Sequence, residues 1–146
     1  MTPRTWWKAV RLPLVLVVVP PALFMIFVAG PRPALAQVTA FSLPLWYGAC
    51  AALAGWRVVG LGAGGSRGAI AAGLVIANAN LVVLSGLVGL WILMPWGSTR
   101  EAGVIDFVKA LPWFGAVMIG VGVVGGWAGG RAAARRAQQR LVARQS

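Results

Sequence analysis

Four apolar stretches fill most of this 146-residue chain, and they limit what it can fold into. They lie at Leu12–Ala29, Val38–Trp56, Ala69–Met94 and Ala110–Ala128, and none contains Asp, Glu, Lys, Arg or His. An α-helix needs roughly 20 apolar residues to cross about 30 Å of hydrocarbon. We therefore predict an all-α integral membrane protein, with four transmembrane helices bundled into a single domain over residues 1–146.

The charged residues predict which way the chain is threaded. If it crosses four times, Arg32, Arg100 and Lys109 lie on one side and the other ten of the thirteen basic residues lie on the opposite side. Those ten are Arg4, Lys8, Arg11, Arg57, Arg67, Arg131, Arg135, Arg136, Arg140 and Arg144. Basic loops stay in the cytoplasm, so we expect both termini there. The excess of Arg over Lys, with abundant Ala and Gly, is typical of GC-rich bacterial genes and favours a bacterial inner membrane.

The eight tryptophans fit the same topology, because indole rings collect at the two membrane boundaries. Four fall near the predicted inner boundary and four near the outer one: Trp6, Trp7, Trp56 and Trp127, and Trp46, Trp91, Trp96 and Trp113.

The first 36 residues also resemble a secretory signal peptide. A basic start leads into an apolar stretch, and Ala34-Leu35-Ala36 before Gln37 has the A-x-A form of a cleavage site. The apolar stretch of about 18 residues is longer than the usual apolar region of a signal, which has about 7–15 residues. We expect the first span to be retained, with cleavage as the open alternative.

Small residues predict close helix packing. Gly48 and Gly55 lie in the second span, in the spacings Gly48-x-x-x-Ala52 and Ala51-x-x-x-Gly55. The fourth span carries two lines of glycines: Gly122, Gly126 and Gly130, and beside them Gly125 and Gly129. Glycines four apart let membrane helices approach closely. The partner of the fourth span is either another span of this chain or a helix of another chain.

Asn78, Asn80 and Ser85 are the polar groups within the third span that can make intramembrane contacts. Residues two apart are about 200° apart around a helix, so the two amides point to nearly opposite faces. An amide in hydrocarbon needs a hydrogen-bond partner. Asn80 could meet another subunit or the head group of a lipid or quinone; the alternative is a backbone carbonyl inside the bundle, with those near Pro20 and Pro21 as candidates.

The connection from Pro95 to Lys109 predicts a short helix on the outer surface. Ser98-Thr99-Arg100-Glu101 has the pattern of a capping box. Arg100, Glu101, Asp106 and Lys109 form a candidate docking patch for an external partner, with a solvated loop of locally paired charges as the alternative.

The tail after the fourth span is basic and is expected to continue that span as a helix. Its arginines are Arg131, Arg135, Arg136, Arg140 and Arg144. Near a membrane surface each attracts anionic lipid by about 1 kcal/mol. A negatively charged cytoplasmic partner is the second interpretation, but no nucleic acid is expected, because the tail lacks aromatic residues for base stacking.

Reaction chemistry is scarce in this sequence. With no histidine and one cysteine, we expect no metal site and no cofactor of its own, although a bound lipid or quinone is compatible with the sequence. The glycines Gly60, Gly62 and Gly65 match G-x-G-x-x-G, but they follow a membrane helix and no acid lies about 20 residues on, so they indicate a hairpin. No catalytic residues are predicted, and we expect no enzyme.

Packing chemistry without reaction chemistry favours a non-catalytic accessory or assembly subunit of a larger bacterial membrane complex. Its partners would be other membrane subunits, in a hetero-oligomer, and anionic lipids. The alternative is a homo-oligomeric channel or carrier for a neutral or lipidic solute, lined by Asn78, Asn80 and Ser85.

Overall fold

The computed structural model describes residues 3–24, 33–93 and 100–145. Within them the chain forms four helices: α1 (Pro3–Phe24), α2 (Pro33–Gly60), α3 (Ser66–Leu93) and α4 (Arg100–Gln145). Each helix contains all or most of one apolar stretch and extends beyond it at one end or both. The predicted all-α class is confirmed.

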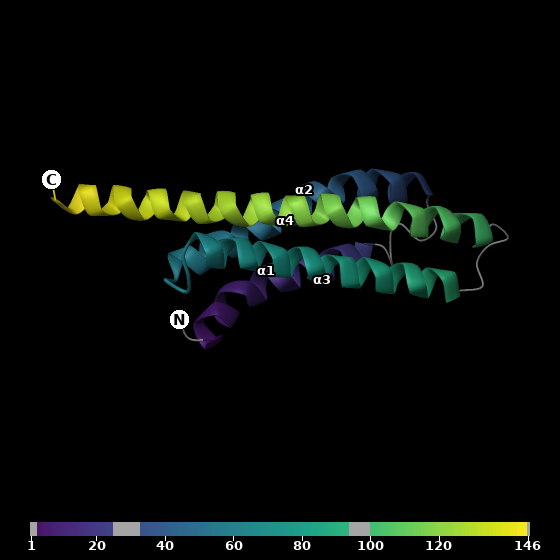
Figure 1. The fold of residues 1–146 in the computed structure, drawn as a ribbon, viewed down its shortest axis with the longest axis horizontal. Coiled ribbons are helices and arrows are strands. Elements are labelled where there is room, and N and C mark those ends of the chain that lie inside the picture. Colours follow the sequence, from purple (N-terminus) through teal and green to yellow (C-terminus); the bar gives the residue numbers. More distant parts are fainter. Residues whose placement is uncertain (1–2, 25–32, 94–99, 146) are drawn as a thin grey trace.

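The α3 and α4 helices run along the long axis of the molecule, α1 is inclined to them, and the start of α1 and the end of α4 lie toward the same end (Figure 1). The turn at residues 61–65 between α2 and α3 lies at that end as well (Figure 1). The last part of α4 extends beyond the other helices, and residues 134–145 are exposed. The basic tail therefore continues α4 as a helix, as the sequence predicted.

Two helices contain described segments long and apolar enough to cross a membrane. These are Ser66–Val83 in α3 and Pro112–Gln145 in α4. Only 33% of the first segment and 28% of the second is buried, whereas the core helix of a soluble protein would be mostly buried. The low burial leaves apolar side chains on the surface of both helices.

The predicted separate outer helix does not form, because residues 100–109 belong to the 46-residue α4, which continues through Pro112. A proline removes one backbone hydrogen bond and bends a helix, but it does not have to end one. The change from polar to apolar residues near Lys109 therefore lies within one continuous helix and does not end it.

The glycine-rich turn after α2 is an ordered helix cap. Gly62 has a φ of 64°, the left-handed conformation that glycine adopts at little cost. The amide of Gly62 donates to the Val59 carbonyl at 3.0 Å, and that of Ala63 donates to the Val58 carbonyl at 2.8 Å. This is the Schellman pattern, in which the last carbonyls of a helix are satisfied by the turn that follows it.

Side chains of α2 satisfy backbone carbonyls that prolines leave free in α1. Proline has no N–H, so Pro13 and Pro20 leave the carbonyls of Ala9 and Leu16 without their usual helical donors. Arg57 Nε donates to the Ala9 oxygen at 3.0 Å, and Trp46 Nε1 donates to the Leu16 oxygen at 3.0 Å. The carbonyl near Pro20 is therefore paired with Trp46 and not with an asparagine of the third span.

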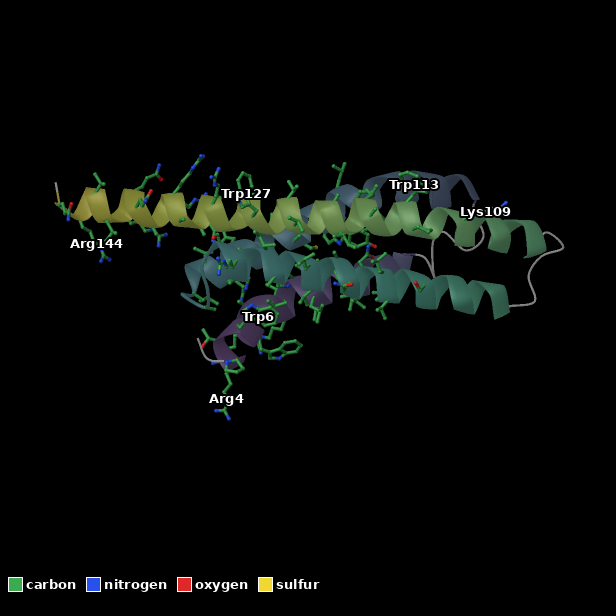
Figure 2. The ribbon with its side chains drawn as sticks, viewed as in Figure 1. Arg4, Trp6, Lys109, Trp113, Trp127 and Arg144 are labelled. Atoms are coloured by element: carbon green, nitrogen blue, oxygen red, sulfur yellow. The ribbon has the colours of Figure 1, made fainter. Side chains whose placement is uncertain are left out.

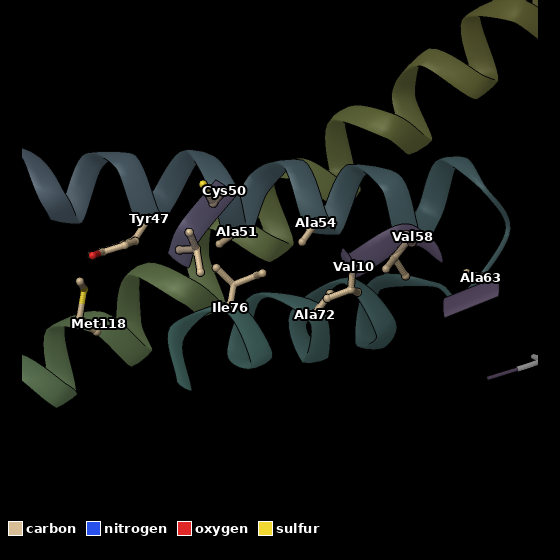
Figure 3. Close-up of a cluster of buried hydrophobic side chains, with 12 residues drawn as sticks. Val10, Tyr47, Cys50, Ala51, Ala54, Val58, Ala63, Ala72, Ile76 and Met118 are labelled. Atoms are coloured by element: carbon tan, nitrogen blue, oxygen red, sulfur yellow. The ribbon is translucent and has the colours of Figure 1, made fainter. Parts of the chain in front are cut away.

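The core between the helices is built largely of small side chains. Ala51 and Ala54 of α2, Ala72 and Ile76 of α3 and Val10 of α1 are all fully buried, and they lie together in Figure 3. Small residues let helix axes approach closely, so packing is dense although few bulky groups are enclosed.

Arg57→Met is expected to lower the free energy of unfolding by about 2 kcal/mol, because the change removes charged donors from two α1 carbonyls. In a Pro13→Ala background the loss should fall below about 1 kcal/mol, since residue 13 then has an N–H that can donate to Ala9. A double-mutant cycle in mixed detergent micelles measures this coupling. Arg67→Met, at an exposed position of α3, is the matched control. Equal losses in both backgrounds would show that the proline carbonyl is not what Arg57 stabilises.

Candidate functional site

One line of α4 glycines packs against α3. A Cβ placed on Gly122 would lie 2.7 Å from the carbonyl oxygen of Gly73, and one on Gly126 would lie 2.5 Å from that of Ala69. A Cβ on Gly130 would lie 2.7 Å from the Cβ of Ala69. These distances leave no room for any side chain, so the backbones of α3 and α4 are in direct contact along this line.

The second line of glycines packs against α2. A Cβ on Gly125 would lie 2.7 Å from the carbonyl oxygen of Gly48, and one on Gly129 would overlap the carbonyl of Ala52. Both lines of α4 glycines are therefore occupied by helices of this same chain. Any surface that meets another protein lies elsewhere.

Gly126 lies where three helices meet. A Cβ on Gly55 of α2 would overlap the Gly126 carbonyl, and a Cβ on Gly73 of α3 would lie 3.1 Å from the Gly126 Cα. Gly55 therefore lets the backbone of α2 pack directly against that of α4 at this junction.

The sequence prediction missed the α3 side of this contact. Ala69, Gly73 and Ala77 follow one another at four-residue spacing and face the α4 glycines, and the Ala77 Cβ lies 2.8 Å from a Cβ placed on Gly122. The same rule of small residues four apart that identified the α4 glycines could have found this line.

Asn80 is completely buried within the bundle, with 0% of its surface exposed. Neither its amide nitrogen nor its amide oxygen has a hydrogen-bond partner among the described residues. A buried amide without partners costs free energy. Asn80 is thus enclosed by this chain itself and makes no bond to a described backbone carbonyl, and its predicted contact with another subunit, a lipid or a quinone stays a prediction.

Asn78 and Ser85 lie on the exposed surface of α3. Asn78 Nδ2 donates to the carbonyl of Leu74, one turn earlier, at 2.9 Å. An amide has two N–H donors and a carbonyl oxygen, so this bond uses only part of its capacity. The neighbouring Val82 is 72% exposed, and a Cβ on Gly86 would meet nothing within 4 Å. The three predicted polar contacts therefore do not share one surface: Asn80 points inward, and Asn78 and Ser85 point outward.

The basic residues lie mainly at the end of the molecule that holds both termini. Arg4 and Arg144 lie toward that end in Figure 2, while Lys109 and Trp113 lie toward the other. The guanidinium of Arg131 is 4.2 Å from the ring centre of Trp127, and that of Arg136 is 4.3 Å from the ring centre of Trp56. All five tail arginines, Arg131, Arg135, Arg136, Arg140 and Arg144, are exposed.

A groove of about 310 Å³ lies between the end of α2 and the tail of α4. Its walls combine three arginines with an aromatic ring and small apolar residues: Arg57, Arg136, Arg140, Trp56, Gly60, Leu61, Ala133 and Ala137.

The predicted outer docking patch is described only in part. Lys109 is exposed near the start of α4. The backbone at Arg100, Glu101 and Asp106 is helical, but their side chains lie outside the described part of the structure. The patch stays a prediction.

Large apolar side chains cover the outside of the bundle. Trp113 of α4 and Leu45 of α2 are each 79% exposed. Exposed apolar surface on this scale is typical of a membrane or protein interface.

No family model matches this chain, and no curated protein or solved structure shows significant similarity to it. Within the described residues, no three of the His, Cys, Asp and Glu side chains are grouped so that they could hold a metal ion.

Proposed function

We propose that this chain is a non-catalytic accessory or assembly subunit of a larger membrane complex in a bacterial inner membrane. All four helices cross the bilayer, with both termini in the cytoplasm. The shared end of the two termini and the 61–65 turn supports this topology, as does the concentration of arginines there. The exposed apolar side chains of α2 and α4 are the surface that lipid covers.

The exposed amide of Asn78 is the observation that carries the proposal. Lipid chains cannot hydrogen-bond to an amide, so a polar group on the outside of a span is stabilised by a neighbouring protein helix. Ser85 and Gly86 extend this face of α3 with one polar and one small residue, and the exposed Val82 adds apolar surface. The α4 glycines already pack against α2 and α3, so the α3 face around Asn78 is the one that meets a partner subunit.

The absence of reaction chemistry from the sequence supports a non-catalytic role. The chain has two acidic residues, one cysteine and no histidine, too few groups for general acid–base or metal chemistry. The alternative, a homo-oligomeric channel or carrier lined by Asn78, Asn80 and Ser85, receives less support, because Asn80 is enclosed within one chain while the other two lie outside.

Photo-cross-linking from α3 tests this proposal. A benzophenone amino acid replaces Ser85, and the matched control replaces the exposed Val124 of α4, 62% of whose surface is accessible. After irradiation of carbonate-washed membranes, we expect position 85 to cross-link to a different membrane protein and position 124 to label lipid. Asn78→Leu should reduce that cross-link at least about fivefold, since the loss of a hydrogen bond in a membrane contact costs about 1 kcal/mol.

The other outcomes are equally informative. A cross-link only to a second copy of the chain would favour the homo-oligomeric alternative. A cross-link only to lipid at both positions would contradict an assembly role. Release of the chain by carbonate washing would contradict the membrane topology itself.

A further inference from the structure

We propose that the groove between the end of α2 and the tail of α4 binds the phosphodiester head group of one acidic phospholipid. The inference rests on the proposed membrane placement, and it goes beyond general attraction of the basic tail to a charged surface. It assigns the anion to one site between the end of α2 and the tail of α4.

The groove gathers positive charge that this chain cannot neutralise. Arg57, Arg136 and Arg140 line it together. The chain has only two acidic side chains, Glu101 and Asp106. Both lie near the start of α4, and the thirty helical residues from Asp106 to Arg136 correspond to about 45 Å along the axis. These arginines therefore have no acidic side chain of this chain close to them and can pair with an external anion.

Two of these arginines, Arg57 and Arg136, are also held in place, as a binding site requires. Arg57 donates from Nε to the Ala9 carbonyl and from Nη2 to the Lys8 carbonyl, at 3.0 and 3.3 Å, which fixes its guanidinium between α1 and α2. Arg136 rests over the ring of Trp56. A guanidinium fixed in this way loses little freedom when it binds a phosphate.

Backbone groups near the groove do not oppose an anion. The end of a helix carries partial negative charge on its last carbonyls. At the end of α2 the carbonyls of Arg57, Val58 and Val59 already accept hydrogen bonds from residues 61–63. The anion therefore meets arginine side chains and not a row of free carbonyls.

The surroundings of the groove favour a lipid over a free phosphate. Trp56 marks the membrane boundary, where lipid phosphates lie. Leu61, 51% exposed, and the exposed Ala137 add apolar surface beside the arginines of the groove. Basic pockets between helices on the cytoplasmic side are the kind of site that binds acidic lipid head groups.

Lipid titration of the full chain in neutral detergent tests the site, with bound lipid counted by native mass spectrometry. Isolated lipids in micelles carry little surface potential, so the measurement reports the site and not the general charge of a bilayer. We expect phosphatidylglycerol to bind at least about tenfold more tightly than phosphatidylcholine. Replacing both Arg136→Gln and Arg140→Gln should weaken phosphatidylglycerol binding about 10- to 30-fold, as expected for the loss of two arginine–phosphate contacts.

Two pairs of variants distinguish loss of the site from two other causes of weaker binding, a lower net charge and misfolding. Arg131→Gln with Arg144→Gln removes the same charge from the same helix outside the groove and should weaken binding less than about threefold. Gly60→Leu fills the groove without changing charge, and a Cβ there has only ordinary contact with Trp56, at 3.6 Å from its Cδ1. It should weaken binding, while Gly65→Leu, at an exposed position where a Cβ would meet nothing within 4 Å, should not.

Equal losses from the two arginine pairs would overturn the site, as would unchanged binding in Gly60→Leu. Free glycerol phosphate that competes as well as the lipid would show that the groove binds a soluble phosphate and would overturn the lipid assignment. If one of these binding tests fails while the chain stays in carbonate-washed membranes, the result counts against the groove alone. A chain released by carbonate would count against the proposed function.

Discussion

Gly126→Ala is expected to lower the free energy of unfolding by about 3 kcal/mol, through forced separation of three helices. The added methyl would lie 2.5 Å from the Ala69 carbonyl oxygen and 3.1 Å from the Gly73 Cα. Both are backbone atoms, so no side-chain rotation can make room. As α4 moves away from α3, it also loses the contact of Gly126 with Gly55.

Gly120→Ala is the matched control, because it makes the same change in the same helix at an exposed glycine where a Cβ would meet nothing within 4 Å. It should leave stability unchanged or raise it slightly, since alanine favours helix more than glycine does. Equilibrium unfolding in mixed micelles measures both variants. Equal changes in the free energy of unfolding for the two variants would mean that the three-helix junction does not form as described.

Asn80→Leu is expected to raise the free energy of unfolding by about 2 kcal/mol. The substitution replaces a fully buried amide, neither end of which has a partner among the described residues, with an apolar group of similar branching. The gain from removing two unpaired polar atoms exceeds the cost of fitting a slightly larger side chain. Thermal and denaturant unfolding in the same micelles provide the measurement.

Asn78→Leu is the natural comparison, since it makes the same change two residues earlier on the exposed side of α3. Its stability should change by less than about 0.5 kcal/mol, as is usual for exposed positions. A lower stability of Asn80→Leu would contradict the prediction and would show that water or another group satisfies the buried amide in the folded protein.

The apolar stretches were enough to predict the helices, because continuous apolar runs of this length are longer than the strands of a sheet. The α3 helix begins three residues before the predicted stretch Ala69–Met94 and is described to Leu93, and the arginine-rich tail continues α4 as expected from its composition. The α4 helix begins before the predicted fourth stretch, at Arg100, because polar residues such as Asp106 and Lys109 are also compatible with helix.

The glycine spacing identified the packing surface of α4 but not its partners. Helical periodicity determines that Gly122 and Gly126 share one side and that Gly125 and Gly129 share a neighbouring one. It does not determine which helix lies on each side, and that choice depends on how four helices arrange themselves together. Only the structure shows that the first line meets α3 and the second meets α2.

The sequence by itself thus determined four helices, the basic character of one end, and two amides on opposite faces of α3. The tertiary structure decided that Asn80 faces inward and Asn78 outward, and that Arg57 and Trp46 reach the carbonyls freed by prolines in α1. The physical reason is that spacing along a helix gives the relative directions of side chains, while the rotation of each helix about its axis is set only by the neighbours against which it packs.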